Sequence, residues 1–311
     1  MALVTEPILA LNGPTASGKS SLAVRVALLL RHRGAAAEVV NVDSMLVYRG
    51  MDIGTAKPTS TERAGVPHHL IDILDVRQKA SVAELQTLAR DAIADCRGRG
   101  VLPIVVGGSA LYMRAVLDRF EFPGTDPAVR ARWEAELERL GSVGLHAELR
   151  SRSPEAADQI QPGNGRRIVR ALEVIELTGS FAPQLPAWTY ALDGVTQWGL
   201  DLPRDELDAR IDARVDAMWA AGFVDEVRGL ADRGLREGRT ASRALGYRQI
   251  LQYLDGHLTE EEAREATKRG TRRFARKQLG WFRRDARIRW RPSGASGVAE
   301  EIVDSLTRGG G

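Results

Sequence analysis

The sequence predicts an α/β protein with a P-loop NTPase-like parallel sheet core and a helical insertion. The first observation is a strand–glycine–helix unit, in which apolar Ile8–Leu11 precedes a glycine-rich turn and a run of apolar residues at helical spacing. A second such unit follows, from the β-branched run Leu102–Val106 through Gly107–Gly108–Ser109. Short apolar runs of this kind are typical of strands covered on both faces, and strands that alternate with helices form parallel sheets.

The turn of the first unit, GPTASGKS, fits the G-x-x-x-x-G-K-[ST] phosphate loop at every fixed position. Its glycines allow successive backbone N–H groups to converge on an anion, and the helix that opens at Lys19 adds its positive dipole end. We expect Lys19 to contact phosphate oxygens and Ser20 to hold Mg²⁺. The phosphate-binding residues expected here are Gly13, Pro14, Thr15, Ala16, Ser17, Gly18, Lys19 and Ser20.

Composition points to an ordinary globular protein of one large or two smaller domains. The 311 residues are 43% hydrophobic and 27% charged. Cys96 is the single cysteine, which excludes an internal disulfide and a Cys-based zinc site, and the five histidines show no metal-ligand spacing. Neither a charged leader followed by an apolar stretch nor a membrane-length apolar run is visible, so we expect a cytoplasmic protein without membrane contact.

Further strands and helices follow from the same patterns. We expect strands at Glu38–Val42, His68–Ile73 and Gln197–Leu202, and helices after Ser81, from Pro203 and around Val298–Leu306. Asp43 ends the second strand, and ligands of parallel sheets bind at the carboxyl ends of strands. The segment Met45–Pro58 is long, polar and glycine-rich, which favours a functional loop.

The expected domains are a catalytic core, residues 1–119 and 190–311, and a helical insertion, residues 120–189. Residues 126–179 are helical in pattern and rich in Arg, Glu and Ala, and Pro183 and Pro186 punctuate the loop behind them.

The last part of the core is strongly basic. Eleven basic residues stand between Lys268 and Arg291, with Asp285 the only acid, although the net charge of the chain is only +3. Such a block favours a polyanionic partner, but a solvated helix face gives the same pattern. We expect its buried side at Phe274, Leu279 and Phe282, and one helical face at Arg269, Arg272, Arg273 and Arg276.

One absence in the sequence argues against ordinary ATP or GTP hydrolysis. P-loop NTPases usually carry an Asp for Mg²⁺ at the end of a strand such as Leu102–Val106, and here that position is Gly107. A GTPase NKxD motif is also missing.

Six motifs, in this order, resemble the IPP transferase family, the tRNA dimethylallyltransferases. They are GPTASGKS, NVDSMLVYRGMDIGTAKP, VVGGSALY, GRRIVRALEV, RALGYRQI and RRFARKQLGWFR, and they cover nearly the whole chain. The resemblance implies transfer of the dimethylallyl group from dimethylallyl diphosphate to the N6 amine of the tRNA adenosine next to the anticodon (position 37). The zinc-finger extension of eukaryotic members is absent.

The resemblance also implies roles for residues. Asp43 matches the general base, Ser109 matches a usual threonine that contacts the adenosine, and Lys19 with Mg²⁺ stabilises the leaving diphosphate. A second cation for the diphosphate is either Arg210 or Arg214. The implied contacts of the tRNA anticodon arm are Asp43, Ser44, Met45, Leu46, Ser109, Arg130, Arg166, Arg167, Ile168, Val169, Arg170, Arg243, Ala244, Leu245, Gly246, Tyr247 and Arg248. Arg166 departs from the glutamine of some members.

Several alternatives stay open. Asp43 could be a helix cap, a hydrogen-bonded loop carboxylate or a Mg²⁺ ligand, and Ser109 could cap the helix after Gly108. The whole protein could be a P-loop small-molecule kinase, a transferase acting on free adenine nucleotides, or a non-enzymatic RNA-binding protein. We expect a monomer.

Overall fold

The computed structural model describes residues 7–181 and 187–308, so Pro183 and Pro186 lie outside the described residues. The chain packs as two compact units. The first combines Met1–Asp118 with Tyr190–Gly311, and the second is Arg119–Thr189. The expected helical insertion, residues 120–189, falls within the second unit.

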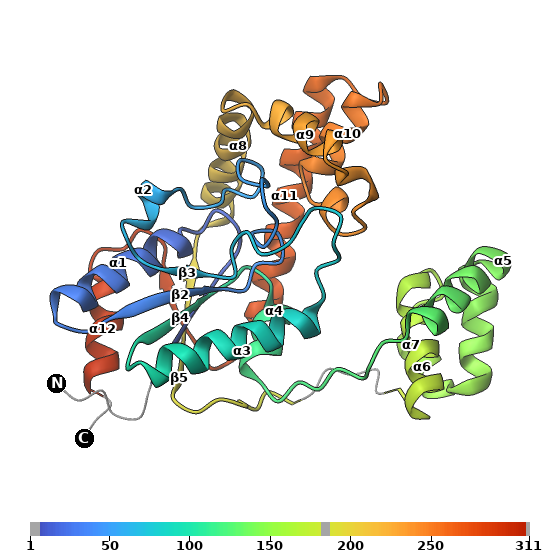
Figure 1. Ribbon diagram of the computed structural model, residues 1–311, viewed down its shortest axis with the longest axis horizontal. Helices are drawn as coiled ribbons and strands as arrows, with labels where there is room; N and C mark the ends of the chain where they lie inside the picture. Colours follow the sequence, from blue (N-terminus) through green and yellow to red (C-terminus); the bar gives the residue numbers. More distant parts are fainter. Residues whose placement is uncertain (1–6, 182–186, 309–311) are drawn as a thin grey trace. The chain divides into compact units, whose positions relative to one another are not determined.

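The first unit is built on a six-stranded sheet in which every pair of neighbours is parallel. The strand order is β3-β2-β4-β1-β5-β6. The strands are β1 (Ile8–Asn12), β2 (Ala37–Asn41), β3 (His68–His69), β4 (Leu102–Val106), β5 (Val195–Asp201) and β6 (Ile288–Pro292). The predicted α/β class is confirmed. Because β1 lies inside the sheet, the loop that follows it opens at the middle of the carboxyl edge (Figure 1).

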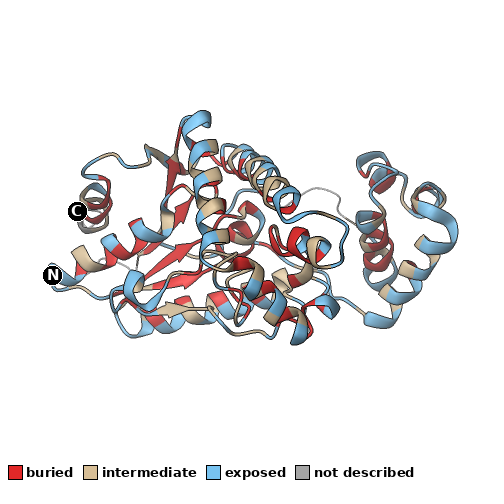
Figure 2. Cartoon of the chain, turned by 90° about the horizontal axis from the view of Figure 1, so that it is seen from above, coloured by how far each residue is buried: buried red, intermediate tan, exposed pale blue. Residues whose placement is uncertain are grey.

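Helices cover both faces of the sheet (Figure 1). Leu9 and Leu11 of β1 pack toward α1 (Lys19–His32) and α12 (Val298–Arg308). Ile8 and Ala10, which point to the opposite face, pack toward α3 (Val82–Gly98) and α4 (Ala110–Leu117). Figure 2 shows buried strands within the sheet, and β1, β2 and β4 are almost continuously buried, as strands covered on both sides require, whereas the edge strands β3 and β6 are mostly not buried.

Most of the remaining helices of the first unit form a layer with a core of its own. They are α8 (Arg204–Ala220), α9 (Phe223–Asp232), η1 (Leu235–Glu237), η2 (Ala241–Arg243), α10 (Tyr247–Leu254) and α11 (Glu260–Phe282), whereas the short helix α2 (Ser60–Arg63) lies beside α1. Phe223 and Tyr247 are fully buried there and meet edge to face, with ring centroids 5.0 Å apart. The loop residues Tyr48 and Met51 pack into the same core.

The second unit contains α5 (Pro127–Arg152), interrupted at Gly141 with φ 68°, together with α6 (Pro154–Gln159) and α7 (Gly165–Thr178). Among the residues of this unit that the structure describes, one acidic side chain lies in the interior: Glu173, which is 0% exposed. Arg130 and Arg170 both form ion pairs with this carboxylate. Burial opposes the charge of Glu173, but the bonds from the two arginines outweigh it and hold its pKa below the usual value.

Two expectations about elements are wrong, and one strand was not predicted. The strand expected at His68–Ile73 contains only His68–His69, because Leu70 and Asp72 have φ of 61° and 57°, outside the extended region. The last part of the basic block forms strand β6, which the sequence patterns did not predict. Phe274 is 44% exposed where the amphipathic pattern predicted burial, and Leu279 is only partly buried, whereas Phe282 is buried.

No helix among residues 7–181 and 187–308 is long and apolar enough to cross a membrane.

Candidate active site

The phosphate loop between β1 and α1 has the backbone of an anion site. Gly13, Ala16 and Gly18 have φ of 143°, 63° and 84°. An added Cβ on Gly13 would lie 2.9 Å from the carbonyl oxygen of Leu200, so this position accepts only glycine. Ala16 holds a left-handed conformation that non-glycine residues rarely adopt, which is typical of functional sites.

Two adjoining pockets open beside this loop. The first, of about 450 Å³, is lined by Lys19, Ser20, Arg210 and Arg214 among others. The second, of about 400 Å³, has a more apolar wall, which includes Ile211, Val215, Met218, Phe223 and Leu245. Residues that line both pockets mark the place where they meet: Thr15, Ala16, Asp43, Thr55, Arg214, Phe274 and Gln278.

The cations of the first pocket differ in how they are held. Lys19 Nζ donates to the carbonyl of Pro14 at 2.7 Å. Burial lowers the pKa of Lys19 to about 8; Asp43 opposes this shift and Arg214 adds to it. Arg210 is tied to Glu206 at 2.7 Å and to Ser293 at 3.1 Å.

The side chain of Arg214 makes no hydrogen bond or ion pair with any described residue, and it lines both pockets. Burial lowers its pKa, and Asp43 and Glu62 oppose that effect. Ser293, the partner of Arg210, also donates to the carbonyl of Ser17 at 2.9 Å, so Arg210 supports the loop. The geometry therefore separates two arginines that the sequence could not distinguish.

Asp43 lies at the junction of the pockets with one oxygen engaged. Its backbone N–H donates to Asn41 at 3.0 Å, and its Oδ1 accepts the N–H of Met45 at 2.9 Å. Its Oδ2 has no hydrogen-bond partner among the described residues. Gly107, which replaces the usual acid after β4, cannot carry a side chain because a Cβ there would lie 2.5 Å from Cγ2 of Val42. The loop-carboxylate alternative thus accounts for only one of the two oxygens of Asp43.

Other residues of the implied acceptor site also line these pockets. Ser109 precedes α4 in the N-cap position, but its hydroxyl makes no capping hydrogen bond and it lines the second pocket. Ser44, Met45, Arg243, Ala244 and Leu245 line the same pocket, and Leu46 lines the first.

The segment Arg243–Arg248 joins η2 to α10. Its arginines Arg243 and Arg248 are exposed and make no ion pair among the described residues. Gly246 has φ 86°, and a Cβ there would lie 2.6 Å from the Phe223 ring. Tyr247 is 0% exposed and its hydroxyl donates to Glu226 at 2.6 Å.

The implied tRNA contacts of the insertion lie in the second unit. Arg166 and Arg167 are exposed on α7, while Ile168 and Val169 are buried in its core. Arg170 also donates to the carbonyls of Pro123 and Gly124, at 2.6 and 3.2 Å.

Sequence reasoning missed three residues that shape the site. Glu226 of α9 accepts the backbone N–H groups of Asp52, Ile53 and Gly54 at 2.6–3.2 Å. Lys57 is buried and bonds the Tyr48 carbonyl at 2.8 Å. Gln278 accepts the N–H of Thr15 at 2.9 Å. Lys57 and Gln278 lie within the quoted motifs, but the motifs alone do not reveal their contacts.

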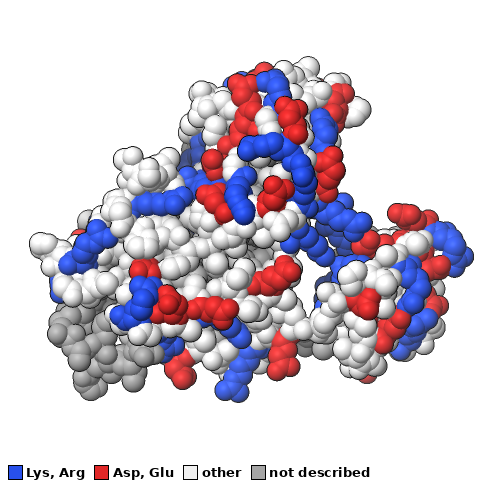
Figure 3. Space-filling model, viewed as in Figure 1, with Lys and Arg blue, Asp and Glu red and all other residues white. Residues whose placement is uncertain are grey.

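The basic block divides into two parts. Lys268, Arg272 and Arg276 of α11 pair with Asp216, Asp212 and Asp208 of α8, which neutralises one face of the helix. Figure 3 accordingly shows basic and acidic side chains interspersed over the helices labelled α8–α11 in the same view. Arg269, Arg273 and Lys277 are exposed and make no ion pair or hydrogen bond among the described residues.

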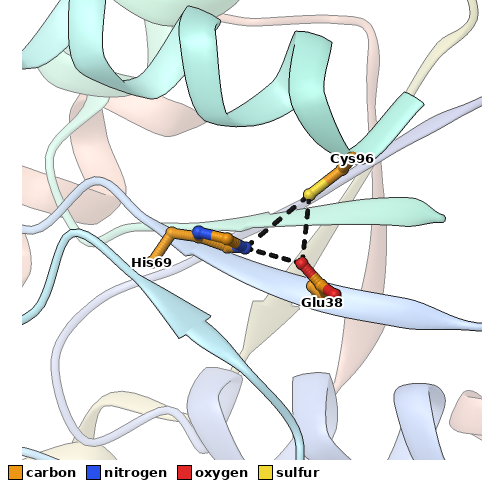
Figure 4. Close-up of side chains that lie close together, drawn as sticks. All are labelled: Glu38, His69 and Cys96. Carbon is orange, nitrogen blue, oxygen red and sulfur yellow. Dashed lines mark hydrogen bonds and ion pairs between the residues drawn. The ribbon is translucent and has the colours of Figure 1, made fainter. Parts of the chain in front are cut away.

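One cluster of metal-ligand types lies away from the pockets. Glu38, His69 and Cys96 place their ligand atoms within 4.8 Å of one another (Figure 4). Arg99 donates to both oxygens of Glu38, at 2.9 and 2.7 Å, and holds the pKa of this carboxyl at about 2. Burial raises the pKa of the Cys96 thiol to about 12, and Glu38 adds to this. The Glu38 carboxylate is already paired with Arg99 and His69, and the cluster joins β2, β3 and α3 as a structural network.

Comparisons with known proteins agree with the motifs. A family model described as IPP transferase matches residues 46–285. The tRNA dimethylallyltransferase of Kineococcus radiotolerans is 63% identical over 289 residues, covering 92% of this chain and 91% of that protein. The tRNA dimethylallyltransferase of Cutibacterium acnes is 58% identical over 300 residues, covering 96% and 94%.

Two solved structures share the fold. The full-length tRNA isopentenylpyrophosphate transferase of Bacillus halodurans superimposes with a TM-score of 0.71 at 41% identity, covering 97% of this chain and 96% of that one. A eukaryotic dimethylallyltransferase, solved acting on tRNA, gives a TM-score of 0.81 at 24% identity, covering 96% and 78%. At that identity the second likeness shows the fold alone.

Proposed function

The chain belongs to the IPP transferase family, and we propose that it transfers the dimethylallyl group of dimethylallyl diphosphate to the N6 amine of adenosine 37 in tRNA, releasing diphosphate. The observation that carries the proposal is the junction of a cationic phosphate pocket with a more apolar pocket, where Asp43 and Arg214 line both.

The diphosphate lies in the first pocket. The C1–O bond of the substrate breaks, and the electron pair leaves with the diphosphate, so negative charge grows on its oxygens. The loop N–H groups and Lys19 face this charge, and Arg214 supplies the second cation while Arg210 holds the loop. One preorganised electrostatic contact of this kind is worth roughly 3–4 kcal/mol in a transition state.

The donor atoms present fit Mg²⁺, which prefers oxygen ligands. Ser20 offers an exposed hydroxyl in the first pocket, and Asp43 offers a carboxylate beside it. Ser20 would hold the ion. When bound, Mg²⁺ supplies positive charge to the diphosphate oxygens.

The adenine lies in the second pocket with its amine toward Asp43. The N6–C1 bond forms there, and the Oδ2 of Asp43 accepts the proton that the amine loses. Ser109 contacts the nucleoside with its uncapped hydroxyl. Phe274, exposed where the pockets meet, offers apolar surface to the dimethylallyl group.

The protein acts as a monomer on the anticodon arm, which the exposed arginines of the segment Arg243–Arg248 and of the insertion bind through its phosphates. The adenosine leaves its stack to enter the pocket. A small-molecule kinase would need no such arginines, and Gly107 leaves it without the usual acid.

Diphosphate release tests this function. Dimethylallyl diphosphate and Mg²⁺ should yield diphosphate only when tRNA is present, and Lys19→Ala should lose most of the release. Free adenosine monophosphate in place of tRNA should give none. Release at the same rate with the mononucleotide would support a transferase acting on free adenine nucleotides, and phosphate transfer from ATP would support a kinase.

A further inference from the structure

We propose that Gln278 is a specificity-determining residue that reads the adenine beside Asp43 while it holds the phosphate loop. This inference rests on the proposed function, because it assigns a contact to the acceptor nucleoside of that reaction. Gln278 lies on α11, lines both pockets, and is only 6% exposed.

The orientation of the Gln278 amide follows from its bond to the phosphate loop. Oε1 accepts the backbone N–H of Thr15 at 2.9 Å. Because a backbone N–H can only donate, the atom that it meets must be the carbonyl oxygen and not the nitrogen of the side chain. The NH₂ group of Gln278 is therefore directed away from the loop.

The NH₂ group lies close to Gly108, at the acceptor end of the junction. A Cβ added to Gly108 would lie 2.6 Å from Nε2 of Gln278 and 3.8 Å from Oδ2 of Asp43. The φ of Gly108 is outside the left-handed range, so its backbone conformation does not require glycine. Glycine is required because any side chain there would collide with the amide of Gln278. The donor Nε2 of Gln278 and the acceptor Oδ2 of Asp43 therefore both lie close to the space beside Gly108.

Nε2 has no acceptor among the described residues, and solvent still reaches this atom in the pocket although Gln278 as a whole is only 6% exposed. A ligand with an acceptor at this place would replace water with a direct hydrogen bond to Nε2.

Adenine presents the complementary pattern. Its N6 amine donates, and the ring nitrogens beside it, N1 and N7, accept. Asp43 Oδ2 takes the amine proton, and Gln278 Nε2 donates to the neighbouring ring nitrogen. Guanine carries an acceptor oxygen in place of the amine. Two acceptors, this oxygen and the carboxylate of Asp43, would then face each other without a proton between them.

The test replaces one atom on each side of the proposed bond. Anticodon stem-loops carry adenosine, 1-deazaadenosine or 7-deazaadenosine at the acceptor position, and single-turnover transfer rates below saturation are compared. The wild type should favour adenosine over one deaza analogue by about 3–10-fold, the size of one neutral hydrogen bond. Gln278→Met, which has a similar shape without donor or acceptor, should remove that preference.

Two further variants make the outcome specific. Gln278→Glu keeps an oxygen that accepts the N–H of Thr15, so the phosphate loop retains this bond if folding depends on it. Because the variant lacks the NH₂ donor, it should also lose the preference for adenosine. Gln252→Met changes an exposed glutamine of α10 and should keep the preference.

An unchanged preference in both Gln278 variants would overturn the inference, as would a wild type indifferent to both analogues. A wild type that does not modify the adenosine stem-loop at all would instead refute the proposed function.

Discussion

At the scale of single residues, the proposed function gives Asp43 the most specific chemistry. One of its oxygens holds the turn at Met45 and the other has no partner among the described residues. Asp43→Asn keeps the shape and one oxygen, so both substrates should bind as before. Loss of a general base typically lowers the rate by about 10²–10⁴-fold. Single-turnover transfer at saturating tRNA and dimethylallyl diphosphate measures this rate.

Mg²⁺ titration of Asp43→Asn separates the two roles left open by the sequence. A metal ligand's loss is compensated by raising Mg²⁺, whereas the loss of a proton acceptor is not. Recovery of the rate at high Mg²⁺ would remove Asp43 from the role of base.

Lys19 gives a dependence on pH. Its pKa is lowered to about 8, chiefly by burial, so the free enzyme loses this charge as the pH rises through that value. The affinity for dimethylallyl diphosphate should be level below about pH 8 and weaken above it. Calorimetric titration of the enzyme across this range measures the change. Lys19→Arg keeps its charge throughout, and an identical decline in that variant would assign the pH effect to another group.

At the scale of elements, α11 has two basic faces with different partners. Arg269, Arg273 and Lys277 make no ion pair among the described residues, whereas Arg272 and Arg276 pair with α8. Removing one side chain that binds a phosphate should lower the slope of log affinity against log salt by about 0.7–0.9. Replacing Arg273 and Lys277 by alanine should therefore flatten the salt dependence of tRNA binding.

Arg272→Ala with Arg276→Ala is the matched control on the same helix. This pair should lower thermal stability instead, because it leaves two aspartates without their partners, and it should keep the salt slope. Equal slopes in both double variants would mean that the exposed face of α11 does not contact the tRNA.

Helices and strands could be predicted from the sequence where residues close together in the chain determine them. The apolar runs around β1 and β4 and the loop between β1 and α1 follow from residues within a few positions of one another. β6 was missed because Ile288–Pro292 is basic, and only its pairing with β5 makes it a strand. Phe274 was misjudged because a helical stripe reports the buried side of a helix, and here part of that side faces a pocket.

The residues of the candidate site also divide into those that local sequence patterns predict and those that only the folded structure reveals. The phosphate loop and Asp43 are visible in sequence because motif and strand end coincide. The choice between Arg210 and Arg214, and the roles of Gln278 and Glu226, depend on contacts between residues far apart in the chain. The charge of Arg130 and Arg170 is shared with a buried glutamate, which spacing along the helices cannot reveal.

At the scale of the whole molecule, the proposed function has one chemical outcome. In this proposal, dimethylallyl diphosphate and an adenosine of tRNA meet where the two pockets join, and the product is a tRNA with one dimethylallyl group on N6. Each residue role proposed above depends on that outcome.

Mass analysis of the tRNA nucleosides after incubation with the protein, dimethylallyl diphosphate and Mg²⁺ tests it most directly. We predict an adenosine heavier by one C5H8 unit, located at position 37 and absent when that position is guanosine. Unmodified nucleosides from a tRNA that the protein demonstrably binds, or the same mass gain at another position, would contradict the proposed function.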